Sequence, residues 1–198
     1  MTHPSVYSRR QIIEAAFELI RERGWSAVST RAIARKLGSS TMPIYSHVRS
    51  VEELEKELRV KTRDLLKEFQ KRPYTPEALL NVAFGYIAFA RDEANLFRFL
   101  FLEKPDPLDA ATLTGMRDSF VAEFGADSDQ GAALLQMSPA AQEALVQHTW
   151  IFTHGLAMLV NSGALGACPD STILRLLSNA GEAFYHWASQ TGGNDDHD

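Results

Sequence analysis

Residues 30–50 read TRAIARKLGSSTMPIYSHVRS, and this stretch decides the fold. A segment with helical periodicity is followed by Gly38, two serines and a threonine, and then by a second short segment that carries Ile44 and Val48. Those two apolar residues are four positions apart, so they share one face of a helix. Two short helices joined by a glycine-containing turn form a helix-turn-helix. We expect Ser40 to cap the second helix.

The other faces of this second helix carry small or flat side chains. Helical geometry turns Met42, Tyr45 and Ser46 outward, with Thr41 and His47 at the margins. A surface helix with a purely structural role usually carries Glu and Lys there, whereas short donors and acceptors allow close approach to base edges in the major groove of DNA. The free amides at the helix N-terminus suit a phosphate. The segment therefore predicts a helix that reads DNA, the alternative being an unusual solvated turn.

The rest of the chain carries helical periodicity and predicts an all-α fold. A helix is expected over residues 8–23, ended by Gly24, and an amphipathic helix over residues 51–70. Ser29, Thr75 and Asp109 are expected to cap helices. The segment GADSDQG is expected to be an exposed loop. Further helices are expected at about 76–91, 95–102, 109–125, 138–161 and 171–190.

Charge divides the chain into two parts of opposite sign. The formal net charge is −5, yet residues 1–72 hold 15 Lys/Arg against 9 Asp/Glu, and residues 73–198 hold 5 against 16. Such asymmetry indicates a basic module that meets a polyanion and an acidic module that does not, unless it is a chance fluctuation. The sign changes at KRPYTPE, where two prolines also break the helical pattern.

These boundaries predict an N-terminal three-helix DNA-binding domain and a C-terminal helical domain for ligand binding and dimerisation. The helix-turn-helix domain is expected at residues 1–50, a connecting helix at 51–72, and the effector-binding and dimerisation domain at 73–190. Residues 191–198, TGGNDDHD, follow the last expected helix and are expected to form a disordered polar tail.

Several classes of function are not supported by the sequence. The longest apolar run, near Trp150 to Val160, contains a histidine and is too short to span a bilayer. Cys168 is the only cysteine, so no internal disulfide is expected, and with no secretory signal we expect a cytoplasmic location. No nucleophile elbow, P-loop, dinucleotide glycine pattern or metal-ligand spacing occurs, so we expect no enzymatic activity, metal or cofactor.

One family is similar to the N-terminal part. The stretch IIEAAFELIRERGWSAVSTRAIARKLGSSTMPIYSHVRSVEELEKEL resembles the DNA-binding domain of the TetR family of bacterial transcriptional regulators. The resemblance implies that Tyr45 and His47 contact phosphates or bases. It also places Thr41, Met42 and Ser46 at base-reading positions. The remaining DNA contacts that we expect come from Ser40 and from the start of the preceding helix, at Thr30 and Arg31.

Two residues depart from the family pattern. Pro43 stands where the family often has Thr or Ser, and Val51 stands where a Lys commonly grips phosphate. Arg49 is close enough to replace that Lys in contacting DNA. Each lost phosphate contact reduces counterion release, so we expect somewhat weaker non-specific binding.

The last two helices suggest how the chain associates. Ile173, Leu177, Ala180, Phe184 and Trp187 step by 4, 3, 4 and 3, the pattern of helix-on-helix packing. The preceding helix is apolar on nearly every side. Pairing both helices with a second copy would form a four-helix bundle. The alternative is that they close the core of one chain, and the family resemblance favours the homodimer.

A second resemblance concerns Trp150, His154 and Gly155, which look like the Trp/His-Gly region of one TetR subgroup. Such domains generally hold a small-molecule pocket among their middle helices. Aromatic and Met side chains with one titratable donor suit an apolar or aromatic effector, although aromatics at helical spacing also form ordinary core. The candidate lining residues are Phe84, Phe89, Phe101, Met116, Phe120, Trp150, His154 and Met158.

The sequence is therefore interpreted as a homodimeric, ligand-responsive transcriptional regulator, a repressor on a palindromic operator in double-stranded DNA. Recognition helices must lie about 34–36 Å apart to reach successive major grooves, and an effector would favour another separation. The alternatives are an activator, a DNA-organising protein without a ligand, and a helical small-molecule-binding protein with a weakened DNA module.

Overall fold

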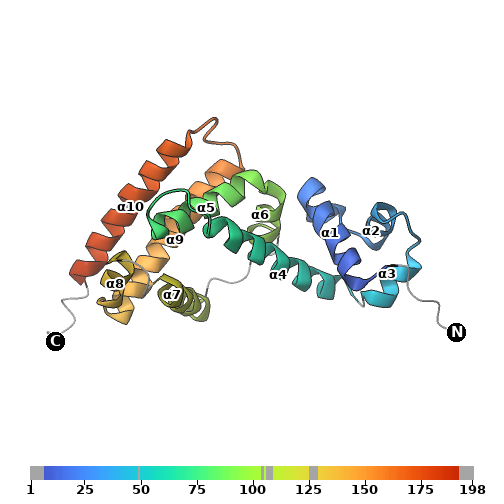
Figure 1. Ribbon diagram of the computed structural model, residues 1–198, viewed down its shortest axis with the longest axis horizontal. Coiled ribbons are helices and arrows are strands. Elements are labelled where there is room, and N and C mark those ends of the chain that lie inside the picture. The colour runs from blue at the N-terminus through green and yellow to red at the C-terminus, as the bar shows by residue number, and fades with distance from the viewer. Residues whose placement is uncertain (1–6, 49, 104, 106–108, 125–128, 192–198) are drawn as a thin grey trace. The chain divides into compact units, whose positions relative to one another are not determined.

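The computed structural model of the protein describes residues 7–48, 50–103, 105, 109–124 and 129–191. Within these ranges the chain is helical and has no strand, so the expected all-α fold is confirmed (Figure 1). The elements are α1 (Arg9–Arg23), the short 3-10 helix η1 (Trp25–Ala27), α2 (Thr30–Lys36), α3 (Met42–His47), α4 (Val51–Gln70), α5 (Ala78–Asp92), α6 (Ala94–Phe101), α7 (Ala110–Phe124), α8 (Asp129–Leu135), α9 (Pro139–Asn161) and α10 (Asp170–Thr191).

The chain divides into two compact units, and neither is continuous in sequence. The first unit comprises Met1–Lys67 and Asp92–Pro105, and the second comprises Glu68–Arg91 and Asp106–Asp198. The expected boundary after residue 72 lies close to the first crossing between them. Composition gave no sign that α6 returns to the first unit, because α6 is apolar like the segments around it.

Helix α1 begins and ends as the sequence predicts. The Ser8 hydroxyl accepts a hydrogen bond from the amide of Gln11, and the Gln11 side chain accepts one from the amide of Ser8 at 2.8 Å, which forms a capping box. Gly24 ends the helix with a φ of 81°, where a side chain would be strained. The buried residues of α1 are Ile12, Ala15, Ala16, Phe17, Leu19 and Ile20.

The turn and α3 follow the predicted helix-turn-helix with one correction. Ser29 caps α2 by accepting from an amide at 3.1 Å, and Ile44 is fully buried, as expected. Ser40, however, does not cap α3. The N-cap position is Thr41, whose φ of −75° and ψ of −18° are already helical, and no side chain caps the helix. A cap residue needs extended backbone to direct its oxygen at the first amides.

A buried arginine joins α4 to α6 inside the first unit. Arg59 pairs with Glu55 at 3.1 Å, and its guanidinium donates to the carbonyls of Leu100 at 3.2 Å and Glu103 at 3.0 Å. Its charge also lies 4.9 Å from the centroid of the Phe99 ring. Because the carbonyls at a helix C-terminus lack helical partners, a cation is favourable there.

Helix α6 also packs on α1. The Arg21 guanidinium donates to the buried carboxylate of Glu93 at 2.7 Å, and the ring of Trp25 lies 5.1 Å from that of Phe99. Leu96 and Phe97 of α6 are fully buried. These contacts make α6 part of the core of the first unit.

In the second unit α9 packs against α10 along its length and also against α7 (Figure 1). Helix α9 lies within the predicted range of 138–161; Ser138 caps it by accepting from the amide of Ala141 at 3.2 Å, and Gly163, with a φ of 74°, follows its end. Asp109 accepts from the amide of Thr112 at 2.8 Å, which confirms that cap. The expected loop at GADSDQG is wrong where the structure describes it, since α8 begins at residue 129.

Helix α5 begins later than predicted. It starts at Ala78, and Thr75 instead accepts from the amide of Glu77 at 3.1 Å and donates to the Asn81 side chain at 3.0 Å. Further along α5, Gly85 meets the backbone at the end of α4: a Cβ there would lie 2.4 Å from the carbonyl oxygen of Phe69. The glycine therefore permits a helix approach that a larger residue would block.

Candidate functional site

Helix α3 presents its outward residues as helical geometry predicted. Met42 is 78% exposed and Tyr45 is 63% exposed, although both are large and apolar enough to be buried elsewhere. Ile44 and Val48 face inward, at 0% and 5%. The short helix is thus held from behind by two apolar side chains, and its exposed face carries a methionine and a tyrosine.

Tyr45 is tied to the preceding helix. Its hydroxyl lies 3.3 Å from the hydroxyl of Thr30 at the start of α2, so the two outer residues are neighbours. Arg31 and Ser40 are exposed, while Thr41 and His47 are half-buried. Most of the predicted contact residues therefore lie on α3 or beside it. The side chain of Ser46 and the whole of Arg49 lie outside the described residues.

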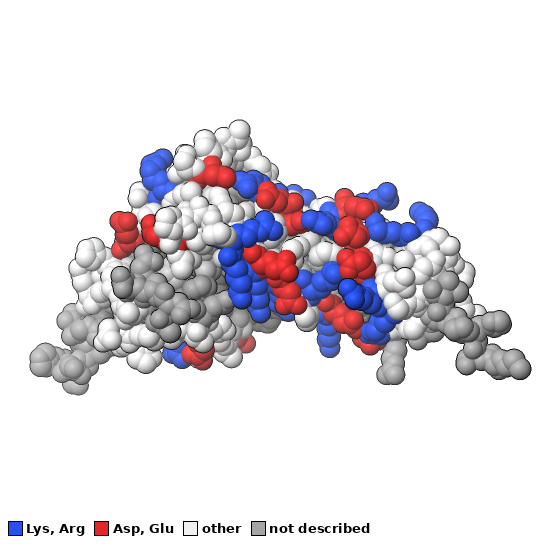
Figure 2. Space-filling model, viewed as in Figure 1, with Lys and Arg blue, Asp and Glu red and all other residues white. Residues whose placement is uncertain are grey.

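On the face drawn in Figure 2, the positive charge of the first unit is mixed with negative charge. Lys and Arg alternate there with Asp and Glu along α1 and α4. Lys61 pairs with Glu14 at 2.6 Å, and Lys36 pairs with Glu22 at 2.7 Å and lowers the pKa of that carboxyl. Near α3, the described residues with exposed positive charge include the arginines of α2, Arg31 and Arg35.

Sequence reasoning missed two residues that contact the backbone around α3. The Tyr7 hydroxyl donates to the carbonyl of Leu37, and the Arg9 guanidinium donates to the carbonyl of His47. Both bonds join residues 30 or more positions apart, and periodicity within one helix contains no signal for them.

The candidate effector residues fall into separate groups. Phe84 and Phe89 of α5 are buried, with Phe84 4.8 Å from the ring of Tyr74 and Phe89 5.6 Å from that of Phe69. Phe101 belongs to the first unit, where its ring contacts Phe97. Met116, Phe120 and Met158 are half-buried in the second unit.

Trp150 and His154 are brought together, with a partner that the sequence did not indicate. Their rings are stacked, 5.0 Å between centroids and 11° between planes. The Tyr86 hydroxyl lies 2.9 Å from His154 Nδ1. Burial raises the pKa of Tyr86 and lowers the pKa of His154, so both side chains are neutral near pH 7 and share one hydrogen bond.

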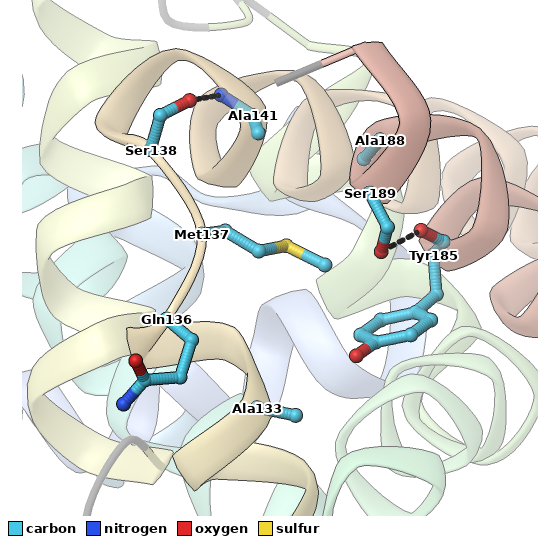
Figure 3. Close-up of a pocket in the computed structure, with 8 residues that line it drawn as sticks. All are labelled: Ala133, Gln136, Met137, Ser138, Ala141, Tyr185, Ala188 and Ser189. Atoms are coloured by element: carbon cyan, nitrogen blue, oxygen red, sulfur yellow. Dashed lines mark hydrogen bonds between the residues drawn. The ribbon is translucent and has the colours of Figure 1, made fainter. Parts of the chain in front are cut away.

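A pocket of about 320 Å³ lies elsewhere in the second unit, between the segment that joins α8 to α9 and the end of α10 (Figure 3). The Met137 side chain extends toward the Tyr185 ring, and Ser189 donates to the Tyr185 carbonyl at 2.7 Å. None of the predicted effector residues lines it. Its lining residues are Ala133, Gln136, Met137, Ser138, Ala141, Tyr185, Ala188 and Ser189.

The predicted association stripe on α10 is partly internal. Ile173 and Leu177 are 1% and 5% exposed in a single chain, so they pack on the chain's own core. Ala180 and Phe184 are half-buried, and Trp187 is 46% exposed. The stripe therefore turns from the core toward solvent along the helix.

The described ranges hold neither a membrane-spanning helix nor a metal-binding cluster. No helix there is long and apolar enough to cross a membrane. No group of three or more His, Cys, Asp or Glu side chains is placed to hold a metal ion among those residues.

Known proteins are similar to both parts of the chain. Residues 12–58 match the family of bacterial regulatory proteins described as the tetR family. An uncharacterised helix-turn-helix-type transcriptional regulator of Mycobacterium tuberculosis is 25% identical over 83% of this chain and 75% of its own length. Another, from Haemophilus influenzae, is 26% identical over 56% of this chain, which spans only 57% of that relative.

A solved structure extends the similarity to the whole fold. The crystal structure of a TetR-like transcriptional regulator from Rhodococcus sp. RHA1 superimposes with a TM-score of 0.61 at 17% identity. The match covers 96% of this chain and all of that one (100%).

Proposed function

The chain belongs to the TetR family of bacterial regulators, and on that premise we propose that it is a ligand-responsive repressor that binds a palindromic operator as a homodimer. We place it in the bacterial cytoplasm, where the DNA is. The observation that carries the proposal is the exposed Met42–Tyr45 face of α3, fixed from behind by Ile44 and Val48. An exposed, backbone-anchored short helix of this kind fits the major groove.

In the proposed complex Tyr45 and Thr30 approach the same stretch of DNA backbone. Their hydroxyls are 3.3 Å apart, close enough to bind one phosphate oxygen between them. Met42 offers an apolar contact to base edges, such as a thymine methyl group. Arg31, exposed next to Thr30, adds positive charge at the same edge.

A homodimer is supported by exposed apolar residues on the two long helices. Ile151 and Leu159 of α9 are 51% and 45% exposed, and Gly155 between them has no other atom within 4 Å of a Cβ position. These residues share one helix face at a spacing of four. On α10, Tyr185 and Trp187 are 40% and 46% exposed. Exposed apolar side chains on the same two helices support an interface there.

The dimer proposal is tested with Leu159→Glu, since a charge at a desolvated interface is costly without a partner. Analytical ultracentrifugation should show a dimer for the wild type and a monomer for the variant. Arg175→Glu on an exposed position of α10 is the control for charge alone. A wild-type monomer at micromolar concentration would contradict the proposal.

The effector, in this proposal, is an apolar or aromatic small molecule. Tyr86 and His154 provide two neutral polar groups, hydrogen-bonded to each other, and Trp150 is stacked on His154. Such a combination orients a ligand through few hydrogen bonds. Binding would change DNA affinity only to the extent that the effector prefers one conformation of the dimer.

DNA recognition is tested by selecting bound sequences from a random duplex pool. Wild type should enrich a palindrome, and Tyr45→Ala should enrich it weakly or not at all. Val60→Ala, a change at an exposed residue of α4, is the matched control and should behave as wild type. If wild type enriches nothing at low salt, the DNA module is weakened and small-molecule binding becomes the better reading.

A transcription assay separates the repressor from the activator. The recovered sequence is placed over a promoter, and transcript is measured with and without the protein. The proposal expects less transcript with the protein, and an increase would identify an activator.

A further inference from the structure

Two residues at the start of α1, Tyr7 just before it and Arg9 as its first residue, contact the two ends of the segment that comprises the turn and α3. Tyr7 donates its hydroxyl hydrogen to the carbonyl of Leu37, the residue that ends α2 and opens the turn. Arg9, two positions later, donates through Nη1 to the carbonyl of His47, the last residue of α3. The two contacts lie 30 and 38 positions away in sequence.

Helix α3 has little of its own to hold its position. It is six residues long and has no side-chain cap at its N-terminus. Helices shorter than about 12–15 residues are marginal in isolation, so tertiary contacts must fix this one. Ile44 and Val48 fix it in the direction of the core, and the Tyr45 hydroxyl contacts that of Thr30 on α2. The bonds at Leu37, which ends α2, and at His47, which ends α3, add a restraint before the turn and another after the helix.

Arg9 connects the end of α3 to α4 as well. Its Nη2 pairs with Glu53 at 2.7 Å, and its Nε donates to Glu57 at 3.1 Å. Glu53 and Glu57 are four residues apart and therefore lie on one face of α4. One planar guanidinium thus bridges α1, α3 and α4, which a lysine ammonium cannot do with the same geometry.

The ion pairs of Arg9 are half-exposed, so they add little to the free energy of folding and mainly hold the Arg9 side chain in position. The Arg9, Glu53 and Glu57 side chains are 37%, 39% and 40% exposed, and water weakens attraction between such charges. The hydrogen bond to the His47 carbonyl has another role: it places a donor at the C-terminus of α3, the end of a helix where backbone carbonyls accept hydrogen bonds from outside the helix.

We propose that Tyr7 and Arg9 are positioning residues for DNA recognition: they hold the two ends of the segment from Leu37 to His47 and so fix the angle at which α3 presents Met42 and Tyr45. This inference rests on the proposed DNA-binding function. It concerns sequence selectivity, because a tilted α3 would still be attracted to phosphates but would no longer align with base edges.

For one variant, an effect of charge alone and an effect through the position of Arg9 predict opposite changes in DNA affinity. Glu53→Ala/Glu57→Ala removes two negative charges, so electrostatics alone would strengthen binding to DNA. If the carboxylates act through Arg9, the same change weakens binding to the operator. Tyr7→Phe tests the other end of the segment with no change in charge.

The experiment measures fluorescence anisotropy with the selected operator and with a scrambled duplex of equal composition, each at several salt concentrations. Tyr7→Phe and Glu53→Ala/Glu57→Ala should lower the ratio of operator to scrambled affinity by about three- to tenfold, the range expected for one lost hydrogen bond. Arg9→Lys should lower it at least as far. Glu14→Ala is the matched control: it breaks the exposed α1–α4 pair with Lys61 without touching α3, and should leave the ratio unchanged.

A second measurement needs no DNA. Amide hydrogen exchange at Val48, whose N–H donates to the carbonyl of Ile44 at 2.9 Å, should be faster in Tyr7→Phe and Arg9→Lys. Exchange at Ile33 in α2 should not change. The inference is overturned if the exchange rate at Val48 is unchanged in these variants. It is also overturned if the Glu53→Ala/Glu57→Ala variant binds the operator more tightly with unchanged selectivity. If wild type itself does not distinguish operator from scrambled DNA, the proposed function fails, whereas selectivity that survives all three variants refutes this inference alone.

Discussion

Replacing Gly85 by Ala should destabilise the second unit, although Ala is the better helix former. The gain in helix propensity is about 1 kcal/mol. Against it, the new Cβ would lie 2.4 Å from the Phe69 carbonyl oxygen and 2.6 Å from Gln70 Cα. Both are backbone atoms, so no rotamer change relieves the contact and the helices must separate.

Overpacking of this kind costs about 1–3 kcal/mol, occasionally more, and a clash with backbone belongs at the upper end. The net loss should be about 1–2 kcal/mol, which for a protein of this size lowers the melting temperature by roughly 3–6 °C. Urea and thermal unfolding followed by circular dichroism measure it.

Gly115→Ala is the matched control for this change. It lies within α7 and has no atom within 4 Å of a Cβ position, so the propensity gain should appear alone, as about 0.5–1 kcal/mol of added stability. The reasoning is refuted if Gly85→Ala unfolds at the same urea concentration as wild type or at a higher one.

Three further changes test separate parts of the structure. Ser29→Ala removes the cap of α2 and should lower the free energy of unfolding by about 1 kcal/mol, measured in urea; Ser29→Asp should keep it. Arg59→Ala leaves Glu55 as a buried carboxylate without its cation and should lower that free energy by about 3 kcal/mol or more, and a loss below 1 kcal/mol would contradict the buried-pair description. Because burial lowers the pKa of His154, the unfolded chain takes up a proton more readily, so stability should fall as pH drops from about 6.5 through the lower folded pKa. His154→Asn should flatten that fall in melting temperature, and an identical pH dependence in the variant would refute the assignment.

Local patterns in the sequence were sufficient for most helix boundaries. Ser8, Ser29 and Ser138 each precede a helix and cap it, and Gly24 ends one, because caps and positive-φ glycines act within a few residues. The inward position of Ile44 and the outward position of Tyr45 also follow from helical spacing alone. The prediction that Ser40 caps α3 was wrong, because the N-cap position is Thr41. A hydroxyl side chain does not by itself determine at which residue the backbone becomes helical.

Long-range contacts could not be predicted from the same patterns. Arg9 meets His47 because the fold brings the start of α1 to the end of α3, and Tyr86 meets His154 because it brings a residue of α5 to one of α9. Nothing in the residues around each one indicates its partner. The aromatic character of Phe101 suggested a pocket, yet its ring packs on Phe97 in the first unit. Apolar composition alone does not distinguish a pocket wall from the core.

The return of α6 to the first unit has a consequence for how the protein is made. Trp25 and Arg59 both contact Phe99, so the core of the DNA-binding unit is incomplete until residue 105 has left the ribosome. A fragment ending at residue 72 would lack the buried side chains of Leu96 and Phe97. Exchange of DNA-binding units between related regulators by recombination after the connecting helix would therefore separate α1 from the α6 that evolved with it, and only exchanges that carry both helices keep the core intact.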